Sequence, residues 1–116
     1  MATAVKLFAY SGMIAHHVAT YNGQQSFHAN FALKQPYLAR EAITAGASAL
    51  ASTADLSASP STKMLRVEVE PDKRIRYEIT PKGADARTAD ADSPLLYGED
   101  HLEFGPGWTI SVVEVA

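Results

Sequence analysis

The chain has 116 residues, of which 47% are hydrophobic and 20% charged, and its formal net charge is −3. This composition fits one folded domain and argues against a disordered chain, a basic nucleic-acid-binding surface and a membrane span, since no apolar stretch reaches about 18 residues. Cysteine is absent, which removes disulfides and zinc–thiolate sites, and the N-terminus lacks the basic start and long apolar run of a secretory signal.

After a first apolar strand, the N-terminal third predicts a β-hairpin. Asn22-Gly23 separates the β-favouring runs 14–21 and 24–33. This dipeptide is typical of a two-residue type I′ turn, because both central residues need positive φ. Counting outward from such a turn sets His17 opposite His28, so we expect these two histidines to be cross-strand neighbours.

The segment 36–60 allows two interpretations. Pro36 could begin a short helix near residues 36–44, but Ile43-Thr44 followed by a glycine favours a strand, and we expect extended structure. Residues 45–60 are rich in Ala, Ser and Thr. They predict an extended connection, or an arm that lies on a neighbouring subunit.

Residues 63–80 show the clearest alternation of apolar and charged side chains. A three-residue loop, 71–73, would join two strands into a hairpin with one apolar face and oppositely charged pairs on the other, worth about 0.2–1 kcal/mol each. The apolar face would present Leu65, Val67, Val69, Ile75, Tyr77 and Ile79, and the outer pairs would be Glu70 with Arg74, Glu68 with Arg76, and Arg66 with Glu78.

The C-terminal part predicts a polar loop over 81–92, a short edge strand at 93–97, a strand at 101–104 and a last strand at 108–115. Together with the earlier units, these short strands and turns predict an all-β chain. We expect a single antiparallel β-sandwich or jelly-roll-like domain over residues 1–116, with about seven or eight short strands.

Motifs for catalysis are missing from the sequence: there is no phosphate-binding loop, no nucleophile elbow and no zinc-protease helix motif. We therefore predict no enzyme activity and no catalytic, cofactor-binding or metal residues. Two places leave metal binding open, the His17/His28 pair and the 83–92 loop with Asp85, Asp90 and Asp92, although neither has the ligand number and spacing of a known site. His16 and His101 are interpreted as rim or surface residues, and the strand-end tyrosines as rim packing: Tyr10, Tyr21, Tyr37 and Tyr97.

The C-terminal half resembles small structural proteins in the virions of tailed bacteriophages. The resemblance covers roughly residues 45–116 and rests on the strands KMLRVEV and RIRYEI, the stretch TADADSPLL, the turn Gly98-Glu99 and the closing FGPGWTISVV, after an Ala-Ser-rich lead-in over 45–60. It implies a β-sandwich fold without catalytic residues. It also implies a capsid decoration or cement protein that stabilises the head shell by protein–protein contacts.

The expected partners are then the major capsid protein or other virion proteins, and further copies of the chain in a homo-oligomer. We expect neither nucleic acid nor membrane as a partner, and we expect the protein in the virion, assembled in the host cytoplasm. The alternative function is a carbohydrate- or ligand-binding β-sandwich, which needs an aromatic platform or a calcium site. A cupin-type enzyme is a third reading, and it needs several histidines around a metal.

Overall fold

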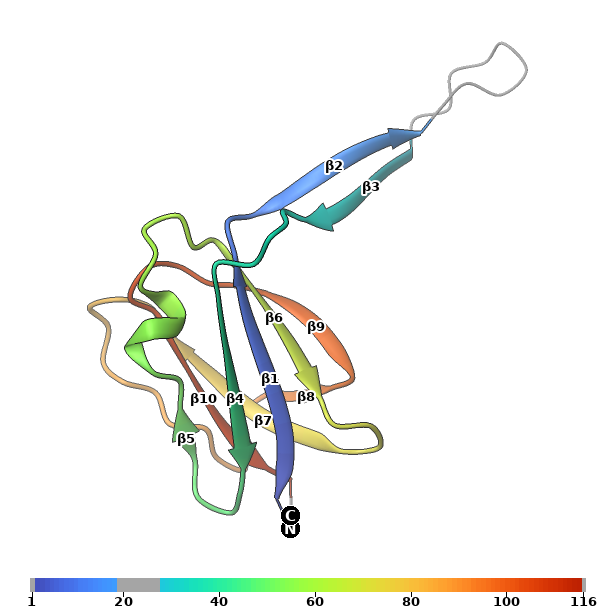
Figure 1. Cartoon of the computed structure of the whole chain (residues 1–116). Coiled ribbons are helices and arrows are strands. Elements are labelled where there is room, and N and C mark those ends of the chain that lie inside the picture. The colour runs from blue at the N-terminus through green and yellow to red at the C-terminus, as the bar shows by residue number, and fades with distance from the viewer. Residues whose placement is uncertain (1, 19–27, 116) are drawn as a thin grey trace.

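The computed structural model describes residues 2–18 and 28–115, with side chains except over 14–18 and 28–32 (Figure 1). Its elements in chain order are β1 (Thr3–Tyr10), β2 (Met13–Val18), β3 (His28–Leu33), β4 (Ala39–Ala45), β5 (Leu50–Ala51), the 3-10 turn η1 (Ala54–Ser57), β6 (Met64–Val69), β7 (Arg74–Thr80), β8 (Leu95–Tyr97), β9 (Glu99–Glu103) and β10 (Thr109–Glu114). The predicted all-β fold is confirmed.

Eight of these strands form a β-sandwich of two four-stranded antiparallel sheets. The first sheet has the order β4-β1-β6-β9 and the second the order β5-β10-β7-β8. Alternate residues of each strand point into the space between the sheets, because successive side chains of a strand point to opposite faces. The buried core draws on both sheets and on η1: Val5, Leu7, Ala9, Ile43, Ala45, Leu56, Leu65, Val67, Val69, Ile75, Leu96, Phe104, Ile110 and Val112.

The predicted hairpin over residues 63–80 is wrong. Strand β6 pairs with β1 and β9 in the first sheet, whereas β7 pairs with β10 and β8 in the second. Between them a turn crosses from one sheet to the other, with Asp72 at φ 64° and the Lys73 N–H donating to Glu70 O at 3.2 Å. The inner faces were predicted correctly, because two strands on opposite sides of one core show the same alternation as two strands of one hairpin.

The outer charged pairs predicted for that hairpin are replaced by other partners. Arg66 forms ion pairs with Glu68 on its own strand and with Glu99 on β9. Arg76 donates from Nη1 to Ser93 O at 2.7 Å, and Glu78 accepts from Ser93 Oγ at 2.7 Å. Glu70 pairs with Lys73 in the turn, whereas no side-chain partner of Arg74 is found among the described residues.

The segment after Pro36 is extended, so a helix over 36–44 is wrong and the expected strand is β4. Residues 45–60 lie against their own sandwich: Leu56 is buried in the core, and Ser52 N–H donates to Ile110 O at 2.8 Å. The carboxylate of Glu41 accepts from Thr53 N and Oγ1, at 2.9 and 2.8 Å, which holds this segment beside β4. These residues form a connection that packs on its own sandwich.

Strands β2 and β3 form a separate two-stranded ribbon that projects away from the sandwich, and we call it the arm (Figure 1). Strand β1 leads into β2, and β3 leads into β4. Ala9–Ala39 is the last pair of the sandwich, and Met13–Leu33 is the first pair of the arm. Three residues separate these pairs on the way out to the arm, and five separate them on the way back. Extra residues on one strand bend a ribbon, and Gly12, at φ 140°, takes up the bend on the shorter side.

The register of the arm differs by one residue from the predicted one. Val18 pairs with His28, and His17 pairs with Ala29, so the two histidines are not cross-strand partners. A register counted outward from an assumed turn shifts throughout when the strands are separated by one residue more or less. The Asn22-Gly23 dipeptide on which the count depended lies outside the described residues.

Candidate functional site

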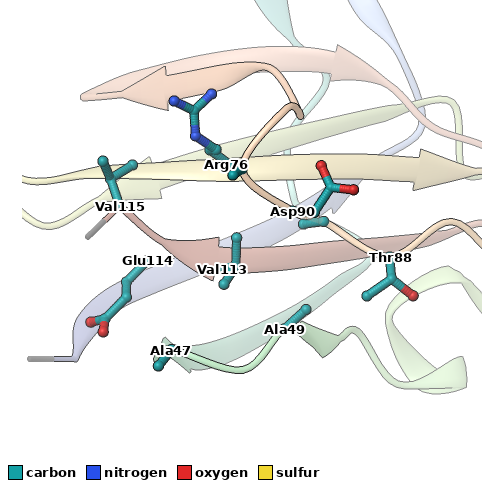
Figure 2. Close-up of a pocket in the computed structure, with 10 residues that line it drawn as sticks. Ala47, Ala49, Arg76, Thr88, Asp90, Val113, Glu114 and Val115 are labelled. Atoms are coloured by element: carbon teal, nitrogen blue, oxygen red, sulfur yellow. The ribbon is translucent and has the colours of Figure 1, made fainter.

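A depression of about 470 Å³ lies on the outer face of the second sheet, beside the loop that follows β7 (Figure 2). The loop is fastened to this face by its backbone: Arg87 N–H donates to Thr80 Oγ1 at 2.8 Å, and Ala89 N–H donates to Ser111 Oγ at 3.0 Å. Most lining residues are small or aliphatic: Ala47, Ala49, Ala89, Ala91, Val113 and Val115, with Thr88, Arg76, Asp90 and Glu114.

Two charged side chains of this depression hold the loop in place. Arg76 binds the carbonyl of Ser93, as described above. Asp90 Oδ1 accepts from Asp92 N–H at 2.9 Å, and Ser93 Oγ accepts from Asp90 N–H at 3.0 Å. These contacts close a tight polar turn against the sheet, so the arrangement favours a packing role for Arg76 and Asp90.

Of the two places where the sequence left metal binding open, only the 83–92 loop has described side chains, and it brings no set of metal ligands together. In the part of the chain that the structure describes, no three His, Asp or Glu side chains could hold one ion. Asp85 and Asp92 are exposed in the loop, and Asp90 is engaged as described. His101 Nε2 lies 3.4 Å from Glu99 Oε1 at the surface. The side chains of His16, His17 and His28 lie outside the described set.

A cluster of aromatic side chains marks the point where the arm leaves the sandwich. The rings of Phe8 and Tyr37 pack edge to face at 5.5 Å between centroids, and those of Tyr10 and Tyr37 at 6.5 Å. Tyr37 and Leu38 are each 39% exposed, while Tyr10 is buried. We call Phe8, Tyr10, Tyr37 and Leu38 the arm root.

Arg66 on β6 connects the arm root with the edge strand β9 of the first sheet. Its guanidinium carbon lies 5.6 Å from the centre of the Phe8 ring, and Nε lies 2.8 Å from Glu99 Oε1. A hydrogen bond with the Tyr10 side chain is the main cause that raises the pKa of Arg66 above its ordinary value; partial burial opposes it, and Glu68 and Glu99 add to it. A permanently charged group under the root holds Phe8 and Tyr10 in place.

The arm and its flanking residues differ from the rest of the chain in composition, and the alternation of apolar and polar residues did not reveal this difference. Residues 7–33 contain no Asp, Glu, Lys or Arg, although one fifth of the chain is charged, and they contain three of its four histidines. Strands that face water on one side usually carry charged or polar residues there. A scan for charge-free windows would have found this segment from the sequence alone.

The strand-end tyrosines do not share one role. Tyr10 and Tyr37 pack at the arm root, as predicted for rim residues, whereas Tyr97 on β8 is 72% exposed. Val69 N–H donates to Gly98 O at 2.7 Å, which places Tyr97 at the end of the sandwich opposite the arm. Tyr21 lies outside the described residues. Rim packing is therefore wrong for Tyr97.

No helix in the described part of the chain has the length and apolar character to cross a membrane. Comparisons of the chain with protein-family models, with curated proteins and with solved structures each give no match.

Proposed function

We propose that this chain is a structural protein of a tailed-bacteriophage virion, of the decoration or cement type. In this proposal the arm and its root dock on the major capsid protein or another virion protein, and several copies act together on the lattice. The observation that carries the proposal is the arm itself: a charge-free ribbon that projects from the sandwich and pairs only within itself (Figure 1).

The physics of a two-stranded ribbon supports a partner for the arm. An isolated hairpin is marginally stable in water, and three strands or a packed face are needed for independent stability. The arm strands Met13–Val18 and His28–Leu33 gain no third strand from their own sandwich. A partner that covers the ribbon would supply the missing contacts.

The charge of the arm favours protein over other partners. Nucleic acids and anionic membranes are attracted chiefly by Lys and Arg, and residues 7–33 have neither. Protein interfaces, in contrast, are depleted of charge at their centre and enriched in aromatic residues. The half-exposed Tyr37 and Leu38 add an aromatic and an apolar side chain beside the uncharged arm.

Three of the four edge strands of the sandwich are poor sites for strand addition, and the fourth, β4, has its Glu41 side chain occupied by Thr53. The arm is therefore the better attachment element. The edge strand β9 presents Glu99, Asp100 and Glu103 to solvent. Charged residues on an edge strand discourage pairing with another chain. The edges of the second sheet are short, since β5 has two residues and β8 has three.

The structure suggests a clean test by removal of the arm. Lys34 N–H donates to Gly12 O at 2.9 Å, so these two residues already form a pair that a two-residue turn can close. We would replace residues 13–33 by Asn-Gly and measure both the free energy of unfolding and co-sedimentation with capsids of the virus that encodes the chain. Arg87→Ala, a change on the exposed loop, is the control.

We expect the arm-replaced protein to unfold within about 1 kcal/mol of the parent, since the buried core lies in the two sheets. It should no longer co-sediment, while the parent and Arg87→Ala do. Equal co-sedimentation of the arm-replaced protein would contradict docking through the arm. A parent that binds no capsid, and a coding sequence that lies in a metabolic operon instead of beside portal and capsid genes, would contradict the virion role.

A further inference from the structure

The end of the sandwich opposite the arm carries an aromatic residue and a cation side by side. Arg74 on β7 and Tyr97 on β8 are directly paired in register, so their side chains lie on the same face as cross-strand neighbours. Together with Pro71, Asp72, Lys73 and Gly98 they line an open groove of about 420 Å³.

The two cations of this groove differ in what they already bind. Lys73 Nζ lies 2.9 Å from Glu70 Oε2 and donates to Ala2 O at 3.1 Å, so it is engaged with the turn and the N-terminus. The side chain of Arg74 is exposed and forms no ion pair or hydrogen bond with any described residue. Tyr97, its neighbour, is 72% exposed, the most exposed of the large hydrophobic side chains described.

We propose that this groove binds an anionic sugar, a hexuronate unit of a polysaccharide. The Tyr97 ring stacks on the C–H face of the pyranose, because an aromatic face suits an apolar sugar face while the hydroxyl groups stay wet. The Arg74 guanidinium holds the carboxylate, since its planar fork matches carboxylate geometry with two parallel hydrogen bonds. Asp72 lies in the lining as an acceptor for a sugar hydroxyl.

The size of the groove favours a sugar over a protein partner. A stable protein interface involves about 20–30 residues on each side, whereas six residues line this groove. Its volume of about 420 Å³ lies in the range of small-ligand sites. The inference does not depend on docking through the arm, because the groove and the arm lie at opposite ends of the sandwich.

The test is a titration of the ¹⁵N-labelled full-length protein, followed by amide chemical shifts. The probes are trigalacturonate and, as a neutral oligosaccharide of equal length, maltotriose. We expect saturable shifts at residues 72–74 and 97–98, with trigalacturonate bound about tenfold more tightly, as expected for one charge-assisted contact. Tyr97→Ala should weaken both sugars about tenfold, and Arg74→Gln should reduce trigalacturonate to the level of maltotriose.

Leu95→Ala, a change at the other exposed position of β8, is the matched control and should bind like the parent. The arm-replaced protein should also bind like the parent, which separates this inference from the virion proposal. The inference is overturned if no saturable shift appears up to about 10 mM trigalacturonate, or if Arg74→Gln binds trigalacturonate like the parent. It is equally overturned if a triglutamate peptide binds as tightly, because the groove would then recognise a carboxylate and not a sugar.

Discussion

The arm continues two strands of the sandwich, yet the two regions have different surroundings. Strands β1 and β4 lie in a four-stranded sheet with a second sheet behind it, whereas their continuations β2 and β3 pair only with each other. In the sandwich, charged residues alternate with buried apolar ones, as along β6. In the arm no position of either strand is charged.

The difference shows how surface composition reflects environment. A sheet with one dry and one wet face places its charges on the wet face. A two-stranded ribbon without charges gains little stability by itself, because an isolated hairpin is marginally stable in water. Folding stability should therefore reside in the sandwich and association in the arm.

The largest effect should come from a core leucine in the sandwich. Leu65 is fully buried in β6, and Leu65→Ala should lower the free energy of unfolding by about 2–5 kcal/mol, because it removes apolar contacts and leaves a cavity. Urea denaturation followed by circular dichroism measures this. Leu95→Ala, on the exposed side of β8, is the matched control and should cost below about 0.5 kcal/mol. Equal losses for both leucines would contradict the assignment of the core.

A tight contact near the arm end of the sandwich offers the next largest effect. A Cβ added to Gly105 would lie 2.7 Å from Trp108 Nε1, so Gly105→Ala should displace the indole and cost about 1–3 kcal/mol. Trp108 is the only tryptophan, and its fluorescence reports the displacement. Gly46→Ala is the control, because an added Cβ there meets nothing within 4 Å. An unchanged emission spectrum in Gly105→Ala would argue against this packing.

A smaller effect is expected at the junction between the two regions. Tyr37→Ala removes two edge-to-face ring contacts at the arm root, each worth about 0.5–1.5 kcal/mol. It should speed hydrogen exchange at the amides of Lys34 and Leu38, which donate to Gly12 O and Ala9 O. Core amides such as that of Val67 should keep their protection. Faster exchange throughout the sandwich would show that root and core are not separable.

The smallest effect is a pH dependence at the turn far from the arm. The hydrogen bond from Lys73 lowers the pKa of Glu70 below its ordinary value. A carboxyl whose pKa is lower in the folded state stabilises the fold above its unfolded pKa, and that contribution is lost as the pH falls through the folded pKa. Lys73→Met should therefore raise the pKa of Glu70 in an NMR titration and leave less stability to lose on acidification. A pKa of Glu70 that stays unchanged in Lys73→Met would refute this pairing.

The sequence by itself determined the class of the fold and the inner faces of β6 and β7. Alternation with period two is a local property, so Leu65, Val67 and Ile75 could be assigned to a dry core from neighbouring residues alone. The closing strand β10 shows the same alternation, with Ile110 and Val112 buried.

Only the tertiary structure decided which strands are neighbours. Strands β6 and β7 look like a hairpin in the sequence but belong to opposite sheets, because charge pairs worth a few tenths of a kcal/mol cannot outweigh the packing of a whole sheet. The same holds for the tyrosines: Tyr10 is buried and Tyr97 is exposed, although both end a strand. Whether a side chain at the end of a strand is buried depends on segments that are distant in the chain. A local sequence pattern therefore cannot predict it.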